Sequence, residues 1–260
     1  MKNNIIEVDG VTKQYRIPRK EELPWKKVVS WFHPTYDIVN AVDSVSFQVT
    51  EGEIIGLLGR NGAGKSTTIK MLTGILYPDG GSIRVGGIEP YKKKKENAWQ
   101  MGVVFGQRTQ LWWDIPVIDT FQLLKTLYKI PEEQYKDRMN LFTDLFTMEE
   151  YINRPVRQLS LGQRICADLC AALLHNPKII YLDEPTIGLD FLNKENIRNF
   201  IKTVNQEYHT TVLITSHDLQ DIEELCSRYL VIDHGQLVCS QSIHEGDTIE
   251  STLRHLYHAV

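Results

Sequence analysis

Short runs of mostly apolar residues recur along the chain, and polar or turn-forming residues flank each of them. Continuous runs of this length are typical of strands that are buried on both faces of a mostly parallel sheet. The runs are residues 53–58, 101–105, 178–182, 211–215 and 229–232. Between the last three, apolar residues follow helical spacing, as at Ile197, Phe200, Ile201 and Val204. Strands that alternate with helices predict an α/β fold.

The stretch from residue 107 to 175 has a different pattern, because no strand-like run occurs in it. A helical spacing of apolar residues predicts instead a helical subdomain inserted into the sheet. The positions that mark this face are Tyr135, Met139, Phe142 and Phe146.

Nearer the N-terminus, apolar and polar residues alternate, as they do in strands with one exposed face. The alternation is clear at Val45, Phe47 and Val49 and weaker around Ile5 and Val8. We therefore expect a small antiparallel β subdomain beside the main sheet.

The composition fits a globular protein, with 42% apolar and 24% charged residues. A net charge of -4 and a pI near 6.1 give no reason to expect nucleic acid as a partner. No apolar run approaches the ~20 residues that a membrane-spanning helix needs, and residues 1–10 do not resemble a signal peptide. We therefore expect a cytosolic protein. Its four cysteines lack metal-ligand spacing and are expected to be reduced core residues: Cys166, Cys170, Cys226 and Cys239.

The segment after the run 53–58 matches the phosphate-binding pattern G-x-x-x-x-G-K-[ST]. Glycines let the backbone N–H groups of such a loop turn toward phosphate oxygens, and a lysine adds a positive charge. Lys65 is that lysine, and Ser66 is the predicted ligand of Mg²⁺. The predicted ATP-binding residues are Gly59, Arg60, Asn61, Gly62, Ala63, Gly64, Lys65, Ser66 and Thr67.

A second part of the site follows the apolar run 178–182, which ends in two adjacent carboxylates. Asp183 is expected to hold Mg²⁺, and Glu184 to accept a proton from the water that attacks the γ-phosphate. Pro185 also suits an ordinary turn at an exposed strand end, which is the simpler interpretation of these residues by themselves. The phosphate loop upstream favours the catalytic interpretation.

Residues 159–163 read Leu-Ser-Leu-Gly-Gln, which resembles the LSGGQ signature of the ATP-binding subunits of ATP-binding cassette (ABC) transporters. The sequence departs from the commonest signature at Leu161, where glycine is usual. The resemblance implies a P-loop NTPase fold in which Ser160, Gly162 and Gln163 face the γ-phosphate of ATP bound to another subunit. A helix start with Ser160 as N-cap is compatible with that role.

Three further positions match the family's order, so that the resemblance covers the chain from about residue 5 to 240, and Tyr15 is the best candidate for one more contact. Gln107 resembles the glutamine that contacts Mg²⁺ and the attacking water, and His217 the histidine that orients the catalytic glutamate. Asp190 resembles the aspartate of the loop along the dimer partner, and Tyr15 the aromatic residue that stacks on adenine. The implied division is an ATPase domain at 1–240 and a helical tail at 241–260.

Residues 17–40 form an insertion that is longer than in the usual cassette. It is rich in basic and aromatic residues, which favours contact with a bilayer or a permease; a solvated loop with an aromatic anchor is an equal alternative. These residues are Arg19, Lys20, Trp25, Lys26, Lys27, Trp31 and Phe32.

The resemblance also implies partners, because each composite ATP site needs two cassettes and the chain carries one set of motifs. A second ATP-binding subunit and separate transmembrane permease subunits are therefore expected, at the cytoplasmic face of the membrane. The segment 111–127 is the expected permease-docking surface, although Leu111, Trp112 and Trp113 could pack inward. The stretch 105–114 resembles bacterial drug and antibiotic export ATPases, which favours export. An import ATPase, or a soluble ATPase acting on nucleic acid or ribosomes, remains as an alternative.

Overall fold

A six-stranded sheet forms the centre of the protein in the computed structural model, which describes residues 3–18, 36–106, 108–244 and 248–258. The strand order is β5-β6-β7-β3-β8-β9, with parallel pairing from β5 to β8 and antiparallel pairing of β8 with β9. The strands are β3 (Ile54–Leu58), β5 (Met101–Phe105), β6 (Ile179–Asp183), β7 (Thr211–Thr215), β8 (Arg228–Asp233) and β9 (Gln236–Ser242). The predicted α/β fold and all five predicted buried strands are confirmed.

The parallel strands of the central sheet lie between two hydrophobic cores, because alternate side chains of these strands enter different cores. In β6, Ile180 and Leu182 pack with the helices of one core, whereas Ile179 and Tyr181 pack with the other. The second core lies between the central sheet, α2 (Lys65–Leu72) and the small antiparallel sheet. This is the arrangement that continuous apolar strands predict.

The small sheet has the order β2-β1-β4 and is antiparallel, as expected. Its strands are β1 (Asn4–Pro18), β2 (Tyr36–Thr50) and β4 (Gly80–Val85). The ends of the insertion belong to this sheet, since β1 and β2 stay paired as far as Pro18 and Tyr36. The charged and aromatic residues of the insertion at 19–35 lie outside the described residues, so contact with a bilayer or permease stays a prediction.

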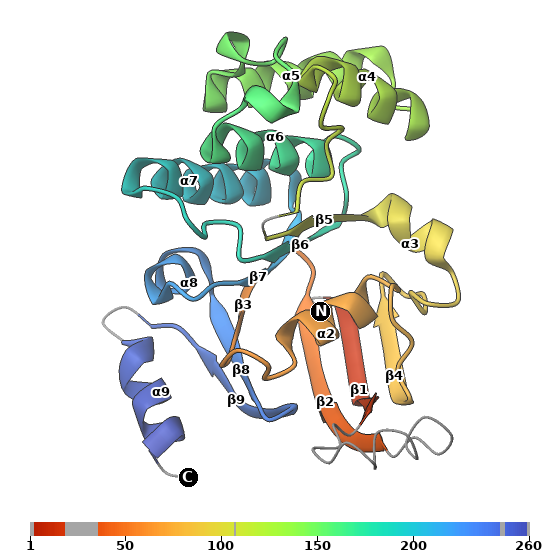
Figure 1. The fold of residues 1–260 in the computed structure, drawn as a ribbon, viewed down its shortest axis with the longest axis vertical. Helices are drawn as coiled ribbons and strands as arrows, with labels where there is room; N and C mark the ends of the chain where they lie inside the picture. The colour runs from red at the N-terminus through yellow and green to blue at the C-terminus, as the bar shows by residue number, and fades with distance from the viewer. Residues whose placement is uncertain (1–2, 19–35, 107, 245–247, 259–260) are drawn as a thin grey trace, which may run out of the picture.

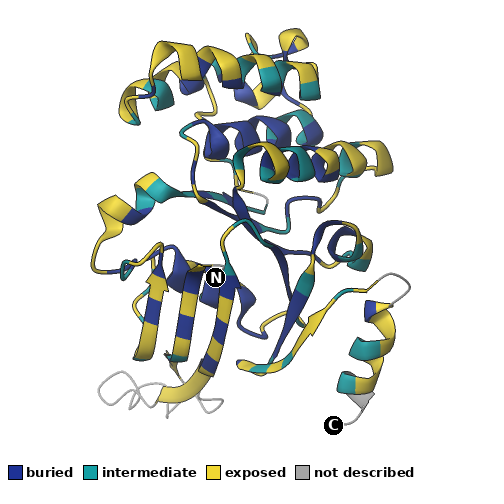
Figure 2. Cartoon of the chain, turned by 180° about the vertical axis from the view of Figure 1, so that it is seen from behind, coloured by how far each residue is buried: buried dark blue, intermediate teal, exposed yellow. Residues whose placement is uncertain are grey.

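Three helices stack above the central sheet in Figure 1, within the stretch predicted to be helical. They are α4 (Val117–Leu127), α5 (Glu132–Phe146) and α6 (Leu161–Leu173). Tyr135, Phe142 and Phe146 of α5 are buried, as their spacing predicts. Figure 2 shows α6 as a largely buried helix between the sheet and the other two.

The remaining helices flank the sheet: α3 (Lys94–Gln100), α7 (Phe191–Tyr208), α8 (Leu219–Leu225) and α9 (Ile249–His258). In α9, Ile249 is buried against the first core, which agrees with the predicted terminal helix. Within the part of the chain that the structure describes, no helix combines the length and the apolar character needed to cross a bilayer.

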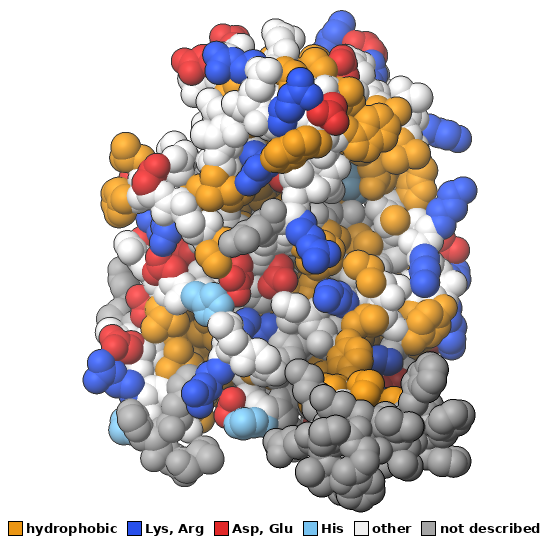
Figure 3. Space-filling model, in the orientation of Figure 1, with side chains coloured by type: hydrophobic (Ala, Val, Ile, Leu, Met, Phe, Trp, Pro, Cys, Tyr) orange, Lys and Arg blue, Asp and Glu red, His pale blue; other side chains and the backbone are white. Residues whose placement is uncertain are grey.

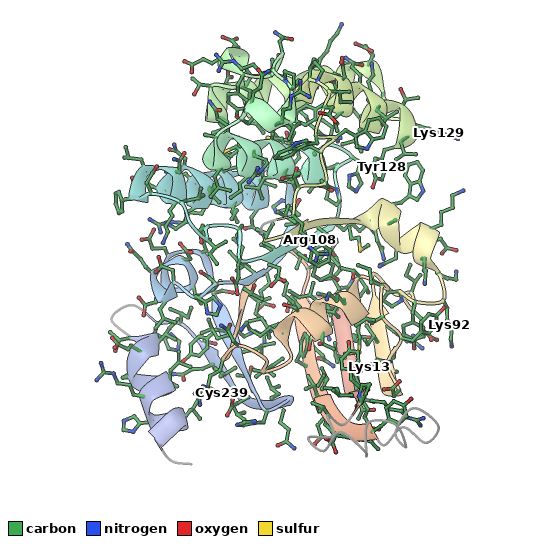
Figure 4. All side chains as sticks on the ribbon, in the orientation of Figure 1. Lys13, Lys92, Arg108, Tyr128, Lys129 and Cys239 are labelled. Atoms are coloured by element: carbon green, nitrogen blue, oxygen red, sulfur yellow. The ribbon has the colours of Figure 1, made fainter. Side chains whose placement is uncertain are left out.

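The cysteines are free, and Cys166, Cys170 and Cys226 are buried as expected. The expectation was wrong for Cys239, which is partly exposed on β9 (Figure 4). Cys239 packs against the first core but stays partly exposed, because β9 is an edge strand whose other residues are mostly exposed.

Candidate active site

The phosphate loop runs from the end of β3 to the start of α2, so that it stands at the carboxyl edge of the central sheet. Two of its glycines are required by close backbone approach. A Cβ on Gly59 would lie 2.1 Å from the carbonyl oxygen of Ile232, and one on Gly64 would lie 2.3 Å from that of Ala41. Both glycines also have positive φ values, of 151° and 113°. The loop is therefore held tightly between β8 and β2.

Lys65 lies folded over this loop and is 6% exposed. Its Nζ donates hydrogen bonds to the carbonyl oxygens of Gly59 and Arg60, at 2.7 and 3.2 Å. Burial lowers the pKa of Lys65, and the nearby carboxylates of Glu184 and Asp183 oppose this shift. The ammonium group thus faces the loop interior, where phosphate oxygens would accept its hydrogen bonds.

Asp183 and Ser66 come together at the end of β6, as the sequence predicts. Oδ2 of Asp183 lies 3.1 Å from Oγ of Ser66, and Oδ1 accepts a hydrogen bond from Thr215 at 2.7 Å. A carboxylate and a hydroxyl at this spacing form an oxygen donor set that fits a hard divalent cation. Sequence reasoning missed Thr215, whose position as the last residue of β7, beside Asp183 in the parallel pairing, is the signal that could have found it.

Glu184 and His217 also meet, with Nε2 of the histidine 2.7 Å from Oε1 of the glutamate. Glu184 has a φ of 57°, which is unusual for a residue with a side chain. Its backbone N–H donates to the carbonyl oxygen and the hydroxyl of Thr215, at 3.1 and 3.0 Å. The loop after β6 is thereby fixed to the end of β7, and two of the side chains predicted to be catalytic, Glu184 and His217, share one edge of the sheet.

Residues 160–163 begin α6 with a capping box. Oγ of Ser160 accepts a hydrogen bond from the N–H of Gln163 at 3.2 Å, and the Gln163 side chain accepts one from the N–H of Ser160 at 3.1 Å. Gly162 faces Asn193 of α7, since a Cβ on this glycine would lie 2.9 Å from its Oδ1. Gly162 of the predicted signature is therefore packed against α7.

Asp190 caps the N-terminus of α7 by accepting hydrogen bonds from the N–H and the side chain of Asn193, at 2.9 and 2.8 Å. The backbone hydrogen bond is the main cause that lowers the pKa of Asp190. Tyr15 pairs with Val39 on β2, two residues before the Ala41 carbonyl that lies against the phosphate loop, and is 38% exposed. Gln107 lies outside the described residues, so its predicted role is untested.

The residues after position 107 are attached to α6 through Asp168, a residue that sequence reasoning did not identify. Its Oδ1 accepts hydrogen bonds from the hydroxyl of Thr109 and the N–H of Gln110, both at 2.9 Å. Gln110 returns a side-chain hydrogen bond to the Asp168 carbonyl at 3.0 Å. Burial raises the pKa of Asp168 to about 6, and these hydrogen bonds oppose the rise.

Comparison with known proteins places this geometry in a family. A protein-family model described as ABC transporter matches residues 42–187, which is more than half of the chain. The ABC transporter ATP-binding protein NatA of Bacillus subtilis is 33% identical over 84% of this chain and 90% of its own length.

Two further relatives match most of this chain but less of their own length. The linearmycin resistance ATP-binding protein LnrL of Bacillus subtilis is 32% identical over 76% of the chain and 63% of its own. The Nod factor export ATP-binding protein I of Ralstonia nicotianae is 32% identical over 81% and 65%.

The fold has close counterparts among solved structures. One ATP-binding subunit of an ABC transporter covers 97% of this chain and 99% of its own, with a TM-score of 0.80 and 21% identity. A dimeric ATP-binding cassette, solved in a post-hydrolysis state with ADP and Pi, covers 92% and 99%, with a TM-score of 0.74 and 24% identity. These likenesses confirm the P-loop NTPase fold. The family match and the relatives show that this chain belongs to the ABC transporter family, as an ATP-binding subunit that hydrolyses ATP.

Proposed function

We propose that the chain is the ATPase subunit of an exporter, which binds ATP between two such subunits and acts on separate permease subunits. The observation that carries this proposal is the separation of the two halves of the predicted site. Lys65, Asp183 and Glu184 meet at the carboxyl edge of the sheet, whereas the residues at 160–163 pack against α7. A second copy, or a close homologue, would supply its own residues 160–163 to this edge.

In this proposal the phosphate loop and Lys65 bind the phosphates of ATP, and Tyr15 stacks on the adenine. Ser66 and Asp183 hold Mg²⁺ together with Gln107. The cation would neutralise charge on the β- and γ-phosphates.

Glu184 accepts the proton of the attacking water, since its carboxylate stands next to Asp183 at the same sheet edge. The hydrogen bond from Nε2 of His217 keeps this carboxylate turned toward the site. An N–H on Nε2 is required for that bond, because an ionised carboxylate only accepts.

The permease-docking surface is proposed around α4. Leu111 is buried and so cannot take part, while Trp112 and Trp113 are 54% and 48% exposed. Leu123 and Leu127 of α4 are exposed as well. Figure 3 shows hydrophobic side chains gathered at the upper right of the molecule, the region where α4 lies in Figure 1. Exposed aromatic residues in one region are typical of protein interfaces, because large apolar surfaces left in water are unfavourable.

Export is proposed on the names of two relatives, one for Nod factor export and one for linearmycin resistance. The subunit would then lie at the cytoplasmic face of the membrane, held there by the permease.

The test is affinity purification of the tagged protein from detergent-solubilised membranes, with partners identified by mass spectrometry. We expect polytopic permease subunits in the product, together with ATPase activity. The double variant Trp112→Ser/Trp113→Ser should lose the permease, and the matched control Val238→Ser, which changes an exposed apolar residue of β9, should retain it. Recovery without any permease would overturn the transport proposal. Co-recovery of an extracytoplasmic solute-binding protein would indicate import and overturn export.

A further inference from the structure

Asp221 of α8 is a fully buried carboxylate that lies outside the predicted ATP site. Its Oδ2 accepts hydrogen bonds from the hydroxyls of Thr186 and Ser216, at 2.5 and 2.8 Å. Its Oδ1 accepts one from Nη1 of Arg198 at 2.9 Å. All three donors are themselves buried, at 2%, 6% and 2% exposure. Removing a carboxylate from water is unfavourable, and three hydrogen-bond donors both offset that cost and fix the position of the side chain.

The two hydroxyl donors flank the two residues that are proposed to act on the attacking water. Thr186 is two residues after Glu184, and Ser216 directly precedes His217. One carboxylate oxygen therefore joins the loop after β6 to the loop after β7. We propose that Asp221 is a positioning residue that sets the spacing of Glu184 and His217, an inference that rests on the roles proposed for these two residues.

The donor to the other oxygen, Arg198, connects this junction to α7. Arg198 also lies 3.1 Å from Glu224 of α8, and Lys194, one turn earlier on α7, pairs with Asp218 at 2.6 Å. α7 is thus joined to α8 and its N-cap by a row of ion pairs in which Asp221 is the middle acid.

The first turn of α7 faces the residues that are proposed to serve the ATP of the second subunit. Asn193 stands against Gly162, and Leu161 lies against Gly188 in the loop before α7. Asn193 is adjacent to Lys194, which begins the row of ion pairs. The row of ion pairs therefore begins one residue after the side chain of α7 that stands against Gly162.

Thr186 offers a clean test because two substitutions separate its hydroxyl from its packing. Thr186→Val keeps the shape and removes the donor to Asp221, whereas Thr186→Ser keeps the donor and removes a methyl group. We expect Thr186→Val to lower kcat about 10- to 100-fold, the effect of a small misplacement of catalytic groups. ATP affinity, measured with a fluorescent ATP analogue in EDTA, should stay within about twofold, because the phosphate loop is untouched. Thr186→Ser should turn over at least about fivefold faster than Thr186→Val.

A purely structural role for Thr186 would give the opposite order, with the shape-conserving Val variant the more active, and that order would overturn the proposal. Equal kcat for wild type and Thr186→Val would also overturn it. If the valine variant does not fold, Ser216→Ala removes the second hydroxyl and should show the same fall in kcat at unchanged ATP affinity; a normal kcat there counts against the proposal. Glu184→Gln is measured in parallel. Full activity of Glu184→Gln refutes the proposed role of Glu184, whereas its inactivity beside an active Thr186→Val refutes only the role of Asp221.

Discussion

At the scale of single residues, Glu184 has an unusual backbone conformation, and this conformation directs the side chain that is proposed to be the general base. A positive φ on a non-glycine residue costs on the order of 1–3 kcal/mol. Two hydrogen bonds from its N–H to Thr215 offset this cost. The conformation turns the chain away from β6 directly after Asp183, so that adjacent carboxylates reach different partners, Ser66 and His217. Strain of this kind is common where a site must hold a side chain in one place.

The first prediction concerns that carboxylate. Glu184→Gln should bind ATP as wild type does and hydrolyse it about 10²- to 10⁴-fold more slowly, the range for loss of a general base. Phosphate release and equilibrium ATP binding measure the two quantities. The control is Glu207→Gln, the same change on an exposed residue of α7, which should hydrolyse at the wild-type rate. Near-normal turnover of Glu184→Gln would contradict the assignment.

At the scale of elements, Ser160 has two separable roles, as the cap of α6 and as a proposed contact to the second subunit's ATP. Ser160→Ala removes the capping box and should lower the stability by about 1 kcal/mol, or roughly 2–4 °C in Tm. Ser160→Asp keeps a good N-cap and should keep the Tm, but its negative charge would oppose a γ-phosphate. We therefore expect ATPase activity to be lost in the aspartate variant although its fold is as stable as wild type. Full activity of Ser160→Asp would place Ser160 away from the phosphate.

A second element-scale prediction concerns His175, which follows α6 and joins it to its neighbours. Its ring stacks on Tyr128 with 4.0 Å between the ring centroids, and Tyr128 meets Trp99 of α3 edge-on. Nε2 of His175 donates a hydrogen bond to the Met101 carbonyl at 3.0 Å. Burial lowers the pKa of His175 to about 4, from an ordinary value of 6.5. The unfolded chain therefore takes up this proton more readily than the folded chain as the pH falls from 6.5 to 4. The contribution of His175 to stability is complete above pH 6.5 and is lost across that window.

The measurement is the free energy of unfolding at a series of pH values for wild type and for His175→Phe, which keeps the stacking on Tyr128. The difference between the two proteins should fall by up to about 3 kcal/mol between pH 6.5 and 4, given about 1.4 kcal/mol per pKa unit. Comparing the two proteins removes the contribution of Asp168, whose raised pKa acts in the opposite direction and is common to both. Parallel curves for the two proteins would show that His175 does not titrate in this range.

At the scale of the whole molecule, the proposed function divides the ATP site between two subunits. ATP that is bound between the phosphate loop of one subunit and residues 160–163 of the other should therefore hold the two subunits together as a dimer. We predict that Glu184→Gln is a dimer in the presence of ATP and Mg²⁺ and a monomer without them, as measured by light scattering after size exclusion. Adding Ser160→Asp should leave it monomeric under both conditions. A dimer that forms equally well without ATP would contradict this role of the nucleotide.

Much of this architecture can be predicted from the sequence, because the sequence patterns that predict it are local. The five buried strands are continuous apolar runs, and their ends shift by no more than one residue between prediction and structure. The phosphate loop is identified by glycines that the close approach of β8 and β2 requires. β9 was not predicted, because an edge strand with alternating exposure has a weak pattern, and Cys239 was misplaced for the same reason.

By itself, then, the sequence determined the fold class and the ATPase activity, since strand periodicity and loop glycines depend on local backbone geometry. It also predicted polar residues, among them Lys65, Asp183 and Glu184, that the structure brings to one edge of the sheet. Tertiary structure decided which side chains meet. Asp168 is the single acidic residue of α6 and Asp221 is one of three in α8, and nothing in their local sequence indicates that they are buried and accept hydrogen bonds from distant loops. Only packing of α6 against residues 109–110, and of α8 between the loops after β6 and β7, gives these carboxylates their partners. Such contacts depend on the relative placement of whole elements, which no local pattern encodes.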